Sequence, residues 1–218
     1  MKHLPKLAFT ACFVLFALMV SAQKTAIYLD KDALYKQGLE LYDKKQYVSA
    51  QKCFLEYINT ARQGVLKADA AFYAAACGIE LFNKDSEWRM KQFIADYPFS
   101  TRINEAWMFM GRSNFRKKKY PETLEYLEKV DIYRLDKEQL AELYFKRGYS
   151  YLQVGQADKA KADFYEIKDV DNKYAFPANY YYSHIAYSEK KYDVALQGFT
   201  RLVGNETFGA VVPYYITQ

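Results

Sequence analysis

The sequence predicts an all-α protein made of about five repeated helix-turn-helix units and the start of a sixth. Three observations predict this architecture. Apolar residues recur at helical spacing on both sides of short turns, a small residue returns every 33 to 40 positions, and a second small residue follows it at a constant distance. The expected array spans residues 30–212, with units at residues 30–64, 65–100, 101–136, 137–173 and 174–208, and residues 213–218 begin a further one.

The small residues mark the place where the two helices of each unit should cross. The first of them are separated by 40, 33, 37 and 35 residues, and they are Gly38, Gly78, Gly111, Gly148 and Ser183. In four units another small residue follows 12 positions later: Ala50, Thr123, Ala160 and Ala195. A large side chain at either position would push the two backbones apart, so we expect the two positions to meet at the crossing.

The first two units contain nearly the same first helix. It begins after Asp30 or Asp32, either of which can cap a helix, and its residues 38–42 (GLELY) are matched by residues 78–82 (GIELF). Pro98 ends the second unit. The apolar face expected on its second helix consists of Trp88, Met90, Phe93 and Ile94.

Units three to five repeat the pattern with clearer boundaries. A basic turn at residues 116–119 separates the two helices of unit three. Asp136 and Gln139 have the spacing of a capping box at the start of unit four, and Gly155 breaks that unit into its two helices. Pro177 lies at the start of unit five.

The N-terminus has the three parts of a secretory signal peptide. Lys2 and Lys6 give a positive start, residues 7–20 are apolar, and Val20-Ser21-Ala22 is a small-residue cleavage site, so we expect the mature chain to begin at Gln23 with a linker over residues 23–29. A retained membrane anchor is the alternative, but the run is shorter than the roughly 20 residues needed to span a bilayer. The leader resembles those of the Bacteroidota. This resemblance implies an exported, periplasmic protein, and a periplasmic protein associated with the outer membrane would also fit.

Composition and charge exclude several classes of function. The chain is 51% hydrophobic and its net charge is +5, or +3 without the leader, which is too mild for the concentrated basic footprint of a nucleic-acid-binding protein. Beyond the leader the only histidine is His184, so neither a catalytic triad nor a metal-ligand cluster is expected. The glycines show no phosphate-cradling pattern. The sequence therefore predicts a non-enzyme without a metal or cofactor.

Two features leave alternatives open. Cys53 and Cys77 lie on helices that should be neighbours, and an exported protein could oxidise them to a disulfide, although a lone cysteine on an apolar helix face is usually a small buried residue. Basic turns at residues 44–45, 116–119 and 190–191 could form an edge for anionic lipid or polysaccharide, or simply be solvated turns, which is the more usual role.

The repeats resemble the tetratricopeptide repeat. The resemblance rests on Trp107, Gly111, Phe115, Thr123 and Leu127 in unit three and on Tyr144, Gly148, Leu152, Ala160 and Phe164 in unit four, and it covers nearly all of residues 30–202. Met90 stands where the family usually has alanine, and most units lack the closing proline. The resemblance implies a right-handed α-solenoid in which the first helix of each unit lines a concave groove.

Residues one turn on either side of the small position are then expected to face that groove. They are Tyr35, Tyr42, Arg112, Arg116, Phe145, Tyr149, Gln153, Tyr180, His184 and Ser188. An aromatic surface with a few donors suits an extended peptide or a helix, while the alternative is that the rings pack between repeats. Arg112 and Arg116 are the favoured groove residues because charge is rarely buried unpaired. The residue after the small position is never asparagine, which argues against the carboxylate clamp of some tetratricopeptide proteins.

The function predicted from these features is a protein–protein interaction scaffold in the cell envelope, serving assembly or secretion machinery. The alternative is a regulatory or targeting domain of a longer enzyme or signalling protein, and a third possibility is glycan capture by the aromatic groove. Because a helix begun at Pro213 without its partner would expose an apolar face, we also expect more chain beyond Gln218, or a partner that covers this end.

Overall fold

The computed structural model describes residues 31–218, and this part of the chain is folded entirely into helices and their connections. It divides into two compact units: unit 1 ends at Ser100, and unit 2 comprises Thr101–Gln218. The predicted leader, the linker and Asp30 lie outside the described residues. Within residues 31–218, every helix is too short or too polar to cross a membrane.

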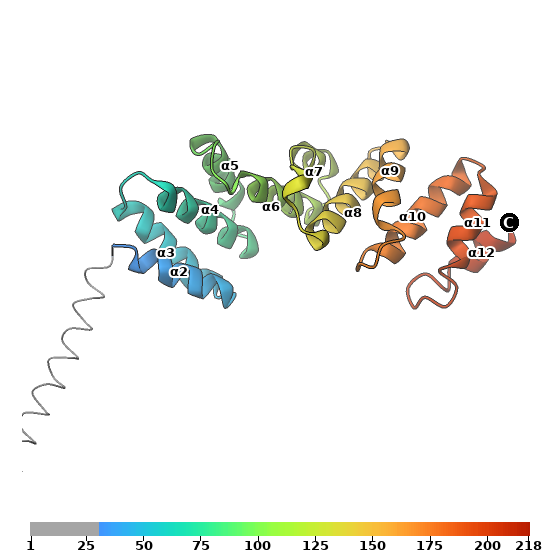
Figure 1. The fold of residues 1–218 in the computed structure, drawn as a ribbon, viewed down its shortest axis with the longest axis horizontal. Helices are drawn as coiled ribbons and strands as arrows, with labels where there is room; N and C mark the ends of the chain where they lie inside the picture. Colours follow the sequence, from blue (N-terminus) through green and yellow to red (C-terminus); the bar gives the residue numbers. More distant parts are fainter. Residues whose placement is uncertain (1–30) are drawn as a thin grey trace, which may run out of the picture. The chain divides into compact units, whose positions relative to one another are not determined.

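Unit 1 contains two helical hairpins (Figure 1). The first is α2 (Ala33–Asp43) with α3 (Tyr47–Thr60), and the second is α4 (Val65–Glu80) with α5 (Ser86–Asp96). Aromatic rings join α3, α4 and α5: Phe54 of α3 stacks on Tyr73 of α4 with centroids 5.2 Å apart, and Phe72 of α4 meets Phe93 of α5 edge-on at 5.5 Å. Helix α4 is therefore buried between the other elements along most of its length.

The first helix begins after Asp32, which is one of the two predicted starts. The Asp32 carboxylate does not cap the helix, because its Oδ1 accepts a hydrogen bond of 2.8 Å from the Tyr57 hydroxyl of α3. Burial and this bond raise the pKa of Tyr57 to about 12. The residue expected to act as a cap thus ties the start of α2 to the end of α3.

Unit 2 continues the pattern with three hairpins and a short last helix. These are α6 (Ile103–Arg116) with α7 (Tyr120–Leu127), α8 (Lys137–Gln153) with α9 (Ala157–Ile167), α10 (Ala175–Ser188) with α11 (Tyr192–Thr200), and α12 (Val212–Thr217); a 3₁₀ turn, η1, covers Ile132–Arg134. In Figure 1 the long connections between α7 and α8, between α9 and α10, and between α11 and α12 lie on the same side of unit 2.

The predicted capping box at the start of α8 is confirmed. The Asp136 carboxylate accepts from the backbone N–H of Gln139 at 2.8 Å, and the Gln139 side chain accepts from the backbone N–H of Asp136 at 3.2 Å. Two of the donors that a helix start leaves unsatisfied are thereby paired.

The helix crossings depend on the predicted glycines, because the second helix of the hairpin leaves little room for a side chain there. A Cβ added to Gly38 would lie 2.7 Å from the Phe54 ring, and one added to Gly148 would lie 3.1 Å from the Phe164 ring. In both hairpins a phenylalanine 16 positions beyond the glycine covers it. The small residue 12 positions on also meets the glycine in the fourth hairpin, where the Ala160 carbonyl oxygen lies 3.3 Å from the added Cβ, and Ala50 of the first hairpin is fully buried.

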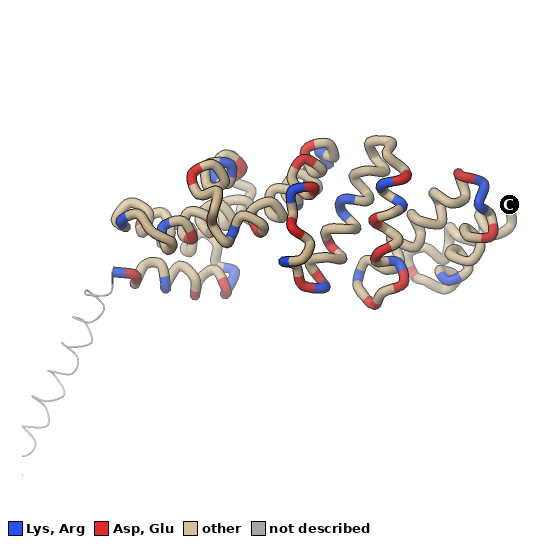
Figure 2. Tube along the Cα trace, turned by 45° about the horizontal axis from the view of Figure 1, so that its top comes forward, with Lys and Arg blue, Asp and Glu red and all other residues tan. Residues whose placement is uncertain are grey.

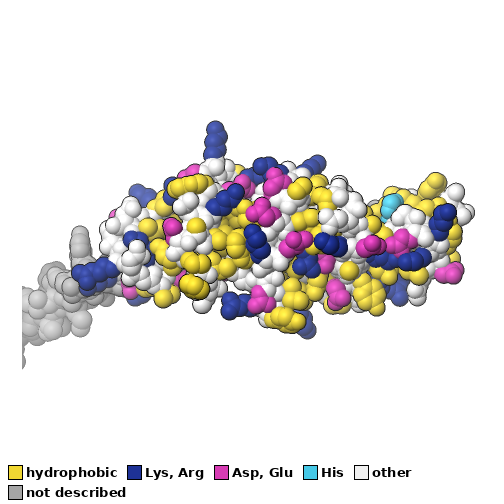
Figure 3. Space-filling model, turned by 90° about the horizontal axis from the view of Figure 1, so that it is seen from above, with side chains coloured by type: hydrophobic (Ala, Val, Ile, Leu, Met, Phe, Trp, Pro, Cys, Tyr) yellow, Lys and Arg dark blue, Asp and Glu magenta, His cyan; other side chains and the backbone are white. Residues whose placement is uncertain are grey.

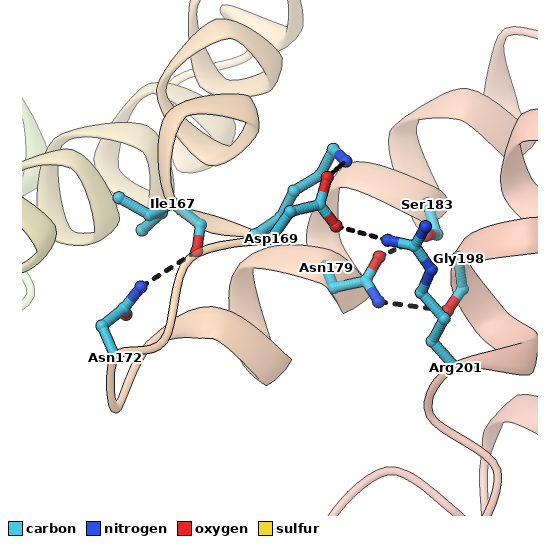
Figure 4. A network of polar contacts seen from close by, with 8 residues as sticks. Ile167, Asp169, Asn172, Asn179, Ser183, Gly198 and Arg201 are labelled. Atoms are coloured by element: carbon cyan, nitrogen blue, oxygen red, sulfur yellow. Dashed lines mark hydrogen bonds and ion pairs between the residues drawn. The ribbon is translucent and has the colours of Figure 1, made fainter.

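The fifth hairpin crosses with polar groups in place of a glycine. The buried Asn179 donates a 3.2 Å hydrogen bond to the Gly198 carbonyl, and Ser183 donates to Asn179 (Figure 4). Here the close approach needs Gly198 on α11, because a Cβ at that position would stand 1.9 Å from the Ser183 hydroxyl.

Each hairpin turn contains one residue with a left-handed backbone. These residues are Lys45, Phe82, Lys118, Gly155 and Lys190, with φ between 57° and 78°. Only glycine adopts this conformation without a steric cost, so four of the five turns are strained in exchange for a tight reversal of the chain.

The predicted apolar face of α5 is correct except for its first member. Met90 and Phe93 are buried, but the side chain of Trp88 is 60% exposed. Trp88 precedes Met90 by two residues, which is about 200° around a helix, so the two cannot share a buried face.

Cys53 is half-buried, Cys77 is buried, and both are free thiols. The disulfide alternative therefore has no support in this structure. Basic and acidic residues are interspersed along both units (Figure 2).

Candidate functional site

Side chains from α6, α8 and α10 share one surface of unit 2, which we call the first-helix face. Its members are Arg112, Phe115, Glu142, Phe145, Lys146, Tyr149 and Tyr181. Ring contacts show that the three helices meet there: Phe115 lies 5.7 Å from Tyr149, and Tyr149 lies 5.3 Å from Tyr181, both edge-on.

An ion cluster lies at one end of this face. Glu142 accepts from Arg112 through both carboxylate oxygens, at 2.9 and 2.6 Å, and Lys146 lies 2.8 Å from it. Burial opposes ionisation of Glu142, but the hydrogen bonds from Arg112 and Lys146 outweigh it and lower its pKa below the ordinary value. Two cations around one carboxylate leave the cluster with a net positive charge.

Aromatic rings cover the rest of the face. The Lys146 ammonium lies 5.4 Å from the Phe115 ring centroid, within the range of a cation–π contact. Tyr120 of α7 and Tyr181 of α10 flank Tyr149, and burial together with the charge and hydrogen bonding of Tyr149 raises the pKa of both. The phenols of Tyr120 and Tyr181 therefore stay neutral at physiological pH, and the hydroxyls of all three tyrosines offer hydrogen-bond donors and acceptors beside the rings.

The two residues predicted for the groove in unit 1 are packing residues. Tyr35 is buried against Phe54 and Tyr57, and its hydroxyl donates to Asp69 at 3.3 Å. Tyr42 is half-buried and its ring lies 5.0 Å from Tyr73. Placing Tyr35 on an open groove was wrong, because α3 and α4 cover its ring.

Arg112 is only 27% exposed and is paired with Glu142, whereas Arg116, one turn later, is exposed. Gln153 and Ser188 are also exposed, each at the end of its helix. Phe145 is half-buried and stacks on Tyr174 at 4.8 Å. The structure thus brings Arg112, Phe145 and Tyr149 together on one face.

Tyr180 and His184 belong to a separate aromatic group near the C-terminus. Tyr180 stacks on Phe208 at 4.8 Å, and burial with a hydrogen bond to Tyr215 raises its pKa to about 12. His184 lies between Tyr180 and Tyr215, with ring centroids 6.2 and 5.6 Å away. These contacts hold α12 against α10.

Sequence reasoning missed Glu142, Lys146, Tyr120 and Tyr181. The four-residue spacing of Glu142 and Lys146 indicates a pair on one helix face and could have found them. Nothing in the sequence indicates that Arg112, 30 residues earlier, completes the cluster.

The described surface shows no dominant sign of charge and no metal site. One face of the molecule carries hydrophobic, basic and acidic side chains side by side (Figure 3). Among residues 31–218, histidine, cysteine and carboxylate side chains do not gather in threes as a metal ion would require.

Paired antiparallel helices that repeat every 33 to 40 residues, with a small residue at each crossing, define a helical repeat fold of the tetratricopeptide type. Solved structures support this fold. A MamA AMB-1 crystal structure matches with a TM-score of 0.65 at 13% identity and covers 86% of this chain and 98% of that one. A second MamA crystal structure matches with a TM-score of 0.61 at 16% identity and covers 83% and 93%.

A weaker likeness, with a TM-score of 0.45 at 18% identity, is to TTC0263, a thermophilic TPR protein of Thermus thermophilus, and it covers 86% of this chain and 97% of that one. No protein-family model matches the sequence, and no curated protein matches it either. At these identities the likeness establishes the fold alone.

Proposed function

We propose that this protein is a non-catalytic interaction scaffold of the cell envelope, and that its first-helix face binds an extended acidic segment of a partner protein. The carrying observation is the Arg112–Glu142–Lys146 cluster among aromatic rings. Arg112 and Lys146 are already held in place by Glu142. A partner carboxylate that approaches them therefore gains charge-assisted hydrogen bonds without the entropy cost of ordering these two side chains.

The aromatic part of the face suits the remainder of such a segment. Rings of Phe115, Tyr149 and Tyr181 offer rigid apolar area, and the phenols can bond to backbone amides and carbonyls. A partly polar surface rich in aromatic rings and arginine is typical of protein recognition sites.

The cell-envelope location rests on the leader predicted for residues 1–22. It is tested by expressing the full chain in a Bacteroidota host and sequencing the N-terminus of the periplasmic fraction. A mature chain that begins at Gln23 is the expected result. An intact Met1 in the cytoplasmic fraction would refute the location and leave the binding proposal standing.

The binding proposal is tested by photo-crosslinking in that host. A benzophenone amino acid in place of Tyr149 should capture a partner, while the same group in place of Tyr165, an exposed residue of α9, should not. The double substitution Arg112→Ala with Arg116→Ala should reduce capture at least tenfold, since each lost charge contact contributes about 1.5–3 kcal/mol.

The matched control is Lys159→Ala with Lys190→Ala, which removes two exposed cations from elsewhere in unit 2. Circular dichroism of all variants checks that the helices remain. Equal capture from both photo-crosslinker positions, or capture that survives the arginine substitutions, would refute the proposal. A captured glycan, detected by periodate staining, would favour glycan binding instead.

A further inference from the structure

A cavity of about 460 Å³ lies in unit 2 beside the first-helix face, and its lining residue Tyr174 stacks on Phe145 of that face at 4.8 Å. Its walls are the first two turns of α8, the end of α9 and the connection at residues 170–174. The volume falls in the range of about 300–1,000 Å³ that is typical of ligand pockets.

Part of the cavity lining is apolar and part is aromatic. Leu140, Ala141 and Ile167 line it together with Tyr144 and Tyr174. Burial raises the pKa of both phenols, so the two rings stay neutral. Val170 also lines the cavity and is 55% exposed, so its side chain is accessible to a ligand.

The connection that forms the outer wall is held in place before any ligand arrives. The Asn172 amide donates to the Ile167 carbonyl at 3.0 Å and to the Val170 carbonyl at 2.8 Å, and its oxygen accepts from the backbone N–H of Tyr174 at 2.8 Å. Asp169, at the start of the connection, pairs with Arg201 of the next hairpin (Figure 4). A pre-organised wall spares a ligand the entropy of ordering it.

Charge around the mouth favours a cationic ligand. Glu138, Glu166 and Asp171 line the cavity, and none of them has a hydrogen bond or ion pair within the part of the chain that the structure describes. The two bases on the rim are Lys137 and Lys173, and the Lys173 ammonium is already placed over the Tyr174 ring at 5.0 Å. Within residues 31–218, three carboxylates without an ion-pair partner therefore line the cavity together with one such base, Lys137.

We propose that this cavity is a second binding site, lined by other residues than those of the first-helix face, and that it takes a basic, apolar peptide segment of a partner protein. The aliphatic stem of a lysine or arginine, or a neighbouring leucine, lies on Leu140 and Ile167. The cation is placed between the three carboxylates and the aromatic rings, where ion pairing and cation–π attraction act together.

The test is calorimetric titration of the purified full chain with two synthetic peptides of equal length, acetyl-Leu-Arg-Leu-Arg-amide and the uncharged acetyl-Leu-Gln-Leu-Gln-amide. The arginine peptide is expected to bind and the glutamine peptide to bind at least tenfold more weakly. In the triple variant Glu138→Gln, Glu166→Gln, Asp171→Asn, affinity for the arginine peptide should fall about tenfold. This is the combined contribution to binding expected from three partly exposed charge pairs.

The matched control neutralises three exposed carboxylates near hairpin turns of unit 2, Glu122→Gln, Asp158→Asn and Asp193→Asn, and should leave affinity within about twofold. A second variant, Val170→Trp, adds bulk at the mouth without changing charge or core and should abolish binding. The proposal is wrong if the arginine peptide gives no binding up to about 1 mM. Equal affinity for both peptides, or equal loss in the two triple variants, would also overturn it.

Discussion

Gly111 of α6 and Leu127 of α7 are packed so closely that a Cβ on Gly111 would stand 2.2 Å from Leu127 Cδ2. Leu127 is fully buried, so it cannot swing away. This contact is the closest that any glycine of a first helix makes with its partner helix in residues 31–218, and it makes the crossing of this hairpin intolerant of any side chain.

The substitution Gly111→Ala is therefore expected to lower the free energy of unfolding by about 1–3 kcal/mol through overpacking. Urea denaturation followed by circular dichroism measures it. Gly64→Ala is the control, because a Cβ there meets nothing within 4 Å. Two variants of equal stability would show that α6 and α7 can separate without cost.

The strained hairpin turns provide a prediction of opposite sign. Lys118→Gly should raise the free energy of unfolding by a few tenths to about 1 kcal/mol, since it relieves a left-handed lysine at φ 57° but enlarges the freedom of the unfolded chain. Gly155→Ala, at the equivalent turn with φ 78°, should lower it by about 1 kcal/mol. The shift in the urea midpoint is the measurement, and a destabilised Lys118→Gly protein would contradict the assignment of strain.

Glu142 should make the protein sensitive to acid. Burial raises the pKa of Glu142, but the hydrogen bonds from Arg112 and Lys146 lower it by more. The folded-state pKa therefore lies below the ordinary 4.5. The stabilisation is then complete above about pH 4.5 and is lost as the pH falls through the folded-state pKa.

Glu142→Gln should therefore cost about 1–3 kcal/mol at pH 7 and progressively less as the pH falls below 4.5. Urea midpoints at several pH values measure this difference. The control is Glu122→Gln, which replaces an exposed carboxylate on α7 by a carboxamide. It should change the free energy of unfolding little at any of these pH values. A Glu142→Gln cost that is the same at pH 3 and pH 7 would mean that the ion cluster does not form in solution.

The two cysteines should differ in reactivity. Burial raises the pKa of the Cys77 thiol to about 12, whereas Cys53 is half-buried. A thiol reagent at pH 8 should label Cys53 at least tenfold faster than Cys77, which reacts only when the chain opens. Mass spectrometry of the Cys53→Ser and Cys77→Ser variants separates the two rates. A mass that changes on reduction by the two hydrogens of a disulfide would contradict the free thiols.

Much of the fold could be predicted because helical repeats leave local signals. The spacing of apolar residues indicated the helix pairs, the returning small residue indicated the crossings, and Asp136 with Gln139 indicated the start of α8. Each of these signals depends on contacts within one hairpin, where sequence distance and spatial distance are tied together by the geometry of the helix.

The candidate sites could be predicted only in part, because they depend on contacts between hairpins. Arg112 is paired with a carboxylate 30 residues away, and Tyr35 of α2 is buried by neighbouring helices. The cavity lies where α8 and α9 meet a connection that Asn172 holds in place. The sequence by itself determined an all-helical repeat architecture and its turns. Only the tertiary structure decided which aromatic and charged side chains remain at the surface, because the packing of one hairpin on the next sets which part of each helix is covered.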